Sequence, residues 1–274
     1  MPLPAGPAGA RFGSALAPTP PSPREIWARS DPLLSSSSVF TALLAALLAA
    51  PPGPALDSPA LDAPTLDSPA LDAPTLDLAA LQSGDLLFHT SRTRQALAIA
   101  WATGSLYTHV GLVERTAEGL FVLEAVHPVR RTPLGAWLAR GVDGRALALR
   151  HPGLAAAARP AVVAAAARYL GRPYDLAFSP GDDALYCSEL VNLAYAAVGL
   201  SVGAWQPAGE LGLAGPPVRR LLKARWRRHP ACKRARSLDA CMPALAAVPI
   251  LTPASIAADP ALVVVGTSYT APAR

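Results

Sequence analysis

The chain has 274 residues, a length that one or two domains can account for, and its formal net charge is +5. Hydrophobic residues make up 51% of it and there are 30 prolines, a skew that is concentrated before residue 80. The remaining part, roughly 190 residues long, is large enough to bury a core of its own. Because no recognition motif or aromatic stacking pattern accompanies the positive charge, we do not expect nucleic acid as a partner.

Residues 1–52 are predicted to be a leader. They contain an apolar run at 39–50, which is too short to span a bilayer, since that takes about 20 residues. Such a run followed by small residues is typical of a secretory signal, so we expect export to the periplasm or cell envelope. The region before the run is long for a signal, which leaves a later translation start, or a cytoplasmic Ala/Leu helix, as the alternatives.

Residues 53–80 are predicted to be a disordered spacer. Within them a five-residue unit of the form Leu-Asp-Ser/Ala-Pro-Ala/Thr repeats from Leu56. A proline in every unit forbids a regular helix, and no run is long enough for a strand. We therefore expect an extended segment that separates the domain from its envelope attachment or cleavage point.

Residues 81–270 are predicted to form one α+β domain, a small antiparallel sheet packed against helices. Apolar alternation and turn residues predict its strands at 86–89, 107–114, 120–126, 145–150 and 262–265. Helical spacing and helix-terminating residues predict helices at 93–103, 133–140, 159–170, 187–199 and 217–228, with a short one after Thr252.

Cys187 lies at the start of the predicted helix that ends at Gly199. The free N–H groups and the dipole of a helix N-terminus favour a thiolate, so Cys187 is a candidate nucleophile. A buried structural cysteine that opens a core helix is the alternative.

His109 and Glu124 lie on neighbouring predicted strands and could serve this thiol. A four-residue loop from Arg115 to Glu118 would place the two side chains directly opposite each other on one face of the sheet. Glu124 stands in an apolar strand and needs a partner, which His109 can be. The three residue types are those of a Cys–His–acid triad, in which the histidine is the base and the carboxylate orients the histidine. A purely structural His–Glu pair is the alternative.

Five segments in this order resemble the YiiX-type permuted papain-like amidases, which belong to the NlpC-type superfamily of cysteine peptidases. They are Gly84-Asp-Leu-Leu-Phe-His, Tyr107-Thr-His-Val-Gly, Phe121-Val-Leu-Glu-Ala, Leu170-Gly-Arg-Pro-Tyr-Asp and Tyr186-Cys-Ser-Glu-Leu-Val. The resemblance implies a circularly permuted papain-like fold and amide hydrolysis without a cofactor or metal, on an envelope amide such as a peptidoglycan stem peptide.

The same resemblance assigns roles to four residues. Cys187 would be the nucleophile, His109 the base, Glu124 the third member, and Tyr174 a residue at the oxyanion or substrate. A loop packing role is the alternative for Tyr174. Two other functions stay open for the whole chain, an acyltransferase acting on lipids or amines and a non-catalytic envelope binding module.

A basic segment at 219–236 and a cysteine pair depart from the family pattern. The segment could contact an anionic envelope surface, or it could be a solvated face. Cys232 and Cys241 could form a disulfide in an oxidising compartment, or bind a metal together with His229, although the spacing matches no standard zinc pattern. His89, at the end of a predicted strand, is expected to be a surface histidine, with a place in the wall of the cleft as the alternative.

Overall fold

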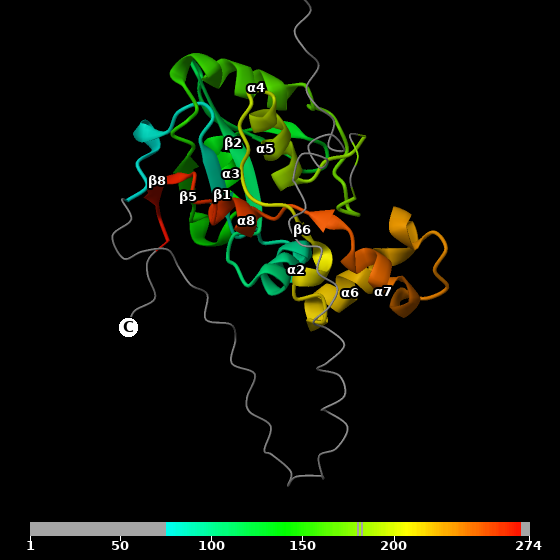
Figure 1. Ribbon diagram of the computed structural model, residues 1–274. Coiled ribbons are helices and arrows are strands. Elements are labelled where there is room, and N and C mark those ends of the chain that lie inside the picture. Colours follow the sequence, from blue (N-terminus) through cyan, green and yellow to red (C-terminus); the bar gives the residue numbers. More distant parts are fainter. Residues whose placement is uncertain (1–74, 180, 182, 270–274) are drawn as a thin grey trace, which may run out of the picture.

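The centre of the fold is a six-stranded antiparallel sheet (Figure 1) in the order β4-β3-β2-β1-β5-β8. The structure is a computed structural model, and it describes residues 75–179, 181 and 183–269. The strands are β1 (Leu86–His89), β2 (His109–Thr116), β3 (Gly119–Glu124), β4 (Arg130–Pro133), β5 (Leu147–Arg150) and β8 (Val263–Thr267). Two further short strands, β6 (Gln206–Pro207) and β7 (Pro249–Ile250), pair with each other. The leader, with its apolar run at 39–50, and the spacer up to residue 74 lie outside the described residues.

Helices cover both faces and one end of the sheet. The α-helices are α2 (Arg94–Thr103), α3 (Leu134–Ala139), α4 (Arg159–Ala167), α5 (Cys187–Ala196), α6 (Pro216–Arg225), α7 (Leu238–Ala246) and α8 (Pro253–Ala257). The 3₁₀ helices are η1 (Leu78–Ala80), η2 (Val142–Gly144), η3 (Ala156–Ala158), η4 (Ala208–Glu210), η5 (Trp226–Arg228) and η6 (Pro230–Cys232). Among the described residues, none of these helices has the length and apolar character needed to cross a bilayer.

The alternation of side chains along the strands divides the interior into two cores. Leu112 and Leu123 point to one face, where they pack with residues of α4 and α5. Val113 and Val122 point to the other face, where they pack with Trp137 of α3. Figure 1 shows α2, α6 and α7 gathered at the end of the molecule away from α4.

The β2–β3 hairpin has a different register from the predicted one. Thr116 pairs with Gly119, so the loop holds two residues rather than four. Continuing that register puts Glu124 opposite Gly111 instead of opposite His109. A shift by two positions keeps every side chain on its original face, so Glu124 and His109 still share a face, as diagonal neighbours.

Strands β2 and β3 pack closely at Gly111, the residue opposite Glu124. A Cβ atom built on it would lie 2.3 Å from Cγ1 of Val122 and 3.2 Å from the carbonyl oxygen of Leu123. A larger residue would therefore require Val122, the neighbour of Glu124 on this face, to move.

The predicted α+β class and the antiparallel sheet are confirmed. Most predicted elements are present, although the helices expected at 159–170 and 187–199 end earlier, at Ala167 and Ala196. Strand β4 and helix α7 were not predicted. Helix α7 begins after Ser237, which caps it by accepting a hydrogen bond from the Ala240 N–H.

Candidate active site

Cys187 is the first residue of α5, and it is buried, with 2% of its surface exposed. The residue before it, Tyr186, is extended, so the chain enters the helix at the sulfur-bearing residue. The first N–H groups of a helix have no acceptor within the helix, and their dipoles favour a negative charge nearby. Burial alone would raise the pKa of the Cys187 thiol, but a hydrogen bond with His109 and the charge of that ring lower it.

His109 is the first residue of β2, at the end of the sheet where α5 begins. Its Nε2 lies 2.6 Å from Oε2 of Glu124, so Nδ1 is the ring nitrogen left for the thiol of Cys187. Burial lowers the pKa of His109, but hydrogen bonds with Cys187 and Glu124 outweigh this effect and raise the pKa to about 9. The site therefore favours an imidazolium beside a thiolate.

Glu124 is fully buried and held on both oxygens. Oε2 faces His109, while Oε1 accepts hydrogen bonds from Thr132 Oγ1, at 2.6 Å, and from the guanidinium of Arg140. Nε of Arg130 lies 3.8 Å from the same oxygen. Burial raises the pKa of Glu124, but these partners reverse that effect and lower it to about 2. The carboxylate is therefore ionised at any pH at which the protein would work.

His89 is not the surface residue that the sequence suggested. It is fully buried, opposite His109 in the β1–β2 register, and its ring stacks on Trp137 at 4.0 Å between centroids. Burial, together with the charges of His109 and Arg140, lowers its pKa to about 3. His89 therefore stays neutral and adds no second positive charge beside His109.

Tyr174 lies close to the thiol, in a loop that bridges to Leu185. Its hydroxyl accepts a hydrogen bond of 2.9 Å from Nε2 of Gln95, and the Gln95 carbonyl accepts one from Arg225. Burial and the nearby charge of Cys187 raise the pKa of Tyr174, so its hydroxyl stays protonated. Sequence reasoning missed Gln95, Arg140 and Thr132, since none of them stands in a recognisable motif.

Two cavities adjoin at this point. A polar cavity of about 490 Å³ has His109, Tyr174 and Arg225 in its wall. An apolar cavity of about 120 Å³ has Cys187 in its wall, and Ile99 lines both. The nucleophile and the base thus face different cavities.

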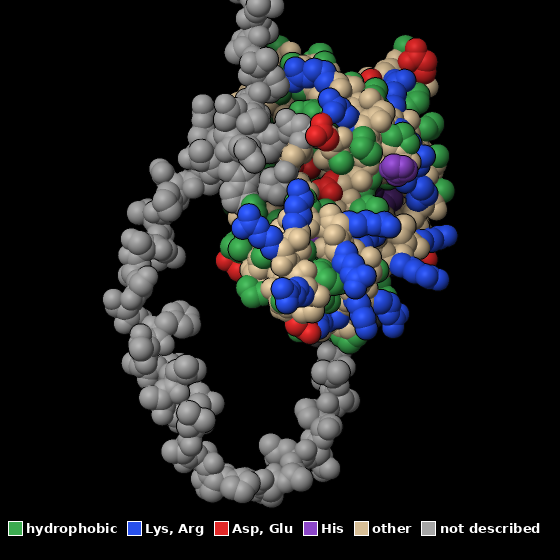
Figure 2. All heavy atoms as spheres, turned by 90° about the vertical axis from the view of Figure 1, so that its right-hand side faces the viewer, with side chains coloured by type: hydrophobic (Ala, Val, Ile, Leu, Met, Phe, Trp, Pro, Cys, Tyr) green, Lys and Arg blue, Asp and Glu red, His purple; other side chains and the backbone are tan. Residues whose placement is uncertain are grey.

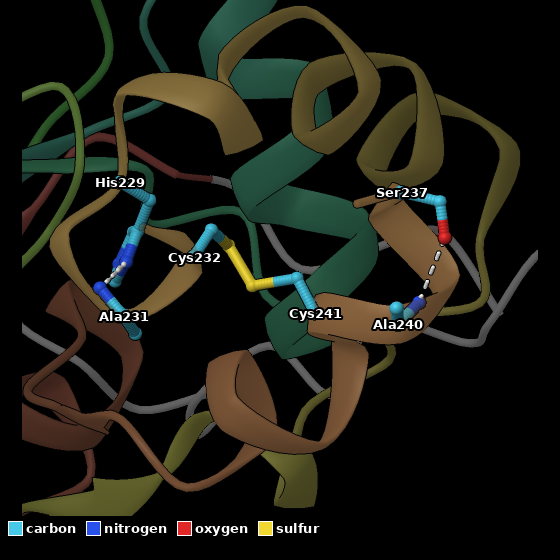
Figure 3. Close-up of a disulfide and its surroundings, with 6 residues drawn as sticks. All are labelled: His229, Ala231, Cys232, Ser237, Ala240 and Cys241. Atoms are coloured by element: carbon cyan, nitrogen blue, oxygen red, sulfur yellow. Dashed lines mark hydrogen bonds between the residues drawn. A yellow bond between two sulfur atoms is a disulfide. The ribbon is translucent and has the colours of Figure 1, made fainter. Parts of the chain in front are cut away.

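Cys232 and Cys241 form a disulfide (Figure 3), so the metal site considered for them with His229 is wrong. Nδ1 of His229 instead accepts a hydrogen bond from the Ala231 N–H. Cys187 is the free cysteine among the described residues.

Comparison with known proteins identifies the family of this chain. Residues 80–266 match the family described as permuted papain-like amidase enzymes, YaeF/YiiX, C92 family. YiiX of Escherichia coli strain K12, described as uncharacterized, is 41% identical over 147 residues, which cover 53% of this chain and 73% of YiiX. The crystal structure of metalloprotein yiiX from Escherichia coli O157:H7 has a TM-score of 0.61 and 34% identity, covering 69% of this chain and 98% of that one. The resemblance seen in the sequence is confirmed: the chain belongs to the permuted papain-like amidases of the YaeF/YiiX type.

Proposed function

We propose that the protein is a cysteine amidase that cleaves amide bonds through Cys187, His109 and Glu124. Two observations carry the proposal: the His109 imidazole lies 2.6 Å from the buried carboxylate of Glu124, and the charge of this ring lowers the pKa of the Cys187 thiol at the start of α5. The family supports amidase chemistry in general. The three roles, the acyl-enzyme and the envelope amide as substrate are our proposal.

The proposed reaction has two steps. The Cys187 thiolate attacks the amide carbonyl carbon, and the developing oxyanion is met by the N–H groups at the start of α5 and by the Tyr174 hydroxyl. The C–N bond breaks as the His109 imidazolium gives its proton to the leaving amine, which leaves a thioester on Cys187. Water then attacks the thioester while His109 takes its proton, and the carboxylic acid departs. Glu124 holds the ring in one tautomer throughout and stabilises its charged form.

No step of this reaction is assigned to a metal. The solved YiiX is described as a metalloprotein. Within residues 75–269, positions 180 and 182 aside, there is no group of three or more His, Cys, Asp or Glu side chains placed to hold a metal ion. His109 and Glu124 already bind each other, and Arg140 covers the second oxygen of Glu124. These donors do not fit a metal site.

We also propose that the protein works in the cell envelope. The disulfide supports this, because disulfides persist in oxidising compartments. N-terminal sequencing of the mature protein should then find cleavage shortly after residue 50, and an intact Met1 would refute export.

The basic segment is proposed to contact anionic lipid. Figure 2 shows Lys and Arg side chains gathered on the side of the molecule where α6 and α7 lie. The segment contributes Arg220, Lys223, Arg227, Arg228, Lys233, Arg234 and Arg236, all exposed. Binding to phosphatidylglycerol vesicles that survives at high salt would contradict a contact of this electrostatic kind.

The direct test of the amidase proposal is the reactivity of Cys187. We expect iodoacetamide to label Cys187 at neutral pH much faster than an exposed ordinary thiol, because its pKa is lowered. Replacing Cys187 by Ser should remove the labelling and reduce amide hydrolysis by at least about 1,000-fold. Slow labelling of the native protein would rule out the enzyme.

Acyl transfer stays the second candidate function because an apolar cavity reaches Cys187. The thioester would then be attacked by an amine in place of water. Formation of a new amide from an added amine, without release of free acid, would favour this alternative.

A further inference from the structure

We propose that the apolar cavity binds the acyl chain of the substrate, so that the protein acts on amides of medium-chain fatty acids. This inference rests on the proposed cysteine amidase function and names the substrate class of the same site. It follows from the position of the cavity relative to the nucleophile, from its lining and from its size.

The position of the cavity assigns it to the acyl side of the amide. Cys187 lines the apolar cavity, whereas His109 lines the polar one. The sulfur bonds to the carbonyl carbon, and the imidazolium gives its proton to the amine, so the two halves of the amide must lie on these two sides. The group that stays on Cys187 as a thioester is therefore the one that the apolar cavity surrounds.

The lining of the cavity suits a hydrocarbon chain. Several parts of the fold form its walls, among them Ile99 and Ala102 on α2, Leu222 on α6, Leu245 on α7 and Val248 just after α7. His229 and Tyr186 are the titratable rings in the wall. Burial lowers the pKa of His229 and raises that of Tyr186, which favours the neutral form of each. Apart from the Cys187 thiolate at its end, the described residues of the wall include no Asp, Glu, Lys or Arg side chain, so a charged group would be bound there at a large desolvation cost.

The size of the cavity limits the chain. Its volume of about 120 Å³ is close to that of engineered apolar cavities, about 150 Å³, that hold one benzene molecule. A chain of about six to eight carbons fills such a space, whereas an acetyl group leaves most of it empty. The octanoyl group is therefore the chain that we expect to be preferred.

The polar cavity suits an anionic amine as the leaving group. Arg225 lies in its wall and belongs to the basic segment. Its guanidinium donates to Gln95 and to the Leu176 carbonyl from one nitrogen, Nη1. An amino-acid carboxylate would complement this positive charge, so N-acylglycines are the probes that we choose.

The test compares N-acetyl-, N-butanoyl-, N-octanoyl- and N-palmitoylglycine as substrates of the full-length protein. In each reaction the C–N bond is hydrolysed, water supplies the oxygen of the released fatty acid, and glycine receives the proton from His109. We expect kcat/KM to rise about threefold to fourfold for each methylene up to octanoyl and to rise no further with palmitoyl. Equal values for acetyl and octanoyl would overturn the proposal.

Two variants change the cavity in opposite directions. Ala102→Leu fills part of it and should lower the octanoyl-to-acetyl ratio of kcat/KM at least about tenfold, while Leu222→Ala enlarges it and should move the optimum to a longer chain. The matched control is Ala100→Leu, on the same helix but in neither cavity wall, which should leave the ratio unchanged. An equal loss in Ala100→Leu would overturn the assignment of the cavity.

A second measurement separates this proposal from the amidase proposal. Octanamide should protect Cys187 from iodoacetamide at concentrations at which acetamide does not. Fast labelling without any protection by octanamide would refute the acyl-chain site and leave the amidase proposal standing. Slow labelling in the absence of any amide would refute both. Cleavage of N-acetyl-leucine amide in preference to N-octanoylglycine would show that the cavity takes a peptide side chain instead.

Discussion

The charge state of the candidate site depends on the buried carboxylate of Glu124. The carboxylate pairs with His109 and helps to keep the pKa of that ring at about 9, while its own pKa falls to about 2. The thiolate–imidazolium pair forms as the pH rises through the lowered pKa of Cys187. It is lost when His109 releases its proton near pH 9. Amide hydrolysis needs both the thiolate and this proton, so its rate should reach a plateau and then fall along an alkaline limb near pH 9.

Replacing Glu124 by Gln should move that alkaline limb to lower pH by about one to three units, because the negative charge that raises the pKa of His109 is gone. The measurement is the rate of amide hydrolysis between pH 5 and 10, because this reaction needs the proton that His109 gives to the leaving amine. Glu114→Gln is the matched control. Glu114 lies on the same strand as His109, and its ion pair is with Arg131 of β4. An unchanged limb in Glu124→Gln would contradict the assigned role of this carboxylate.

The β2–β3 hairpin, which carries the base and the carboxylate, packs too closely at Gly111 for a side chain to fit without movement. In Gly111→Ala, the new Cβ would lie 2.3 Å from Cγ1 of Val122 and 3.2 Å from the carbonyl oxygen of Leu123. We expect a loss of about 1–3 kcal/mol in the free energy of unfolding, measured by urea denaturation, together with slower labelling of Cys187. Gly135→Ala in α3, where nothing lies within 4 Å of the new Cβ, should be neutral or stabilising. Equal stability of the two variants would contradict the clash at Gly111.

The sequence was sufficient to predict elements whose signals are local. Gly104 ends α2 in the left-handed conformation, and Thr252 caps α8 by accepting a hydrogen bond from the Ser255 N–H. The face shared by His109 and Glu124 was also predictable, because side-chain alternation is a local property. The loop length was not, since Thr116 and Gly119 carry no signal that separates a two-residue loop from a four-residue one. The contacts of Arg140 and Thr132 with Glu124 were not predictable either, because only tertiary packing brings these side chains to the carboxylate.

The disulfide joins η6 to α7, and α7 contributes Leu245 to the wall of the apolar cavity. A bridge between residues nine positions apart stabilises the folded protein by about 2–3 kcal/mol in the chain-entropy account. The double variant Cys232→Ala/Cys241→Ala should lose about this much free energy of unfolding.

Thiol titration of the unfolded native protein provides the control. Since the chain has three cysteines and two are joined, one thiol should react before reduction and three after it. Three reactive thiols before reduction would contradict the bridge.

The order of the site residues along the chain has a consequence for how the protein is made. His109 and Glu124 are 15 positions apart on one hairpin, whereas Cys187 follows only after β4, α3, β5 and α4. During translation the imidazole and its carboxylate therefore leave the ribosome well before the sulfur does. Until α5 docks against β2, that sulfur lacks the contacts that lower its pKa and is an ordinary thiol. The nascent polypeptide thus carries no activated nucleophile, and the thiol of Cys187 becomes reactive only at the last stage of folding.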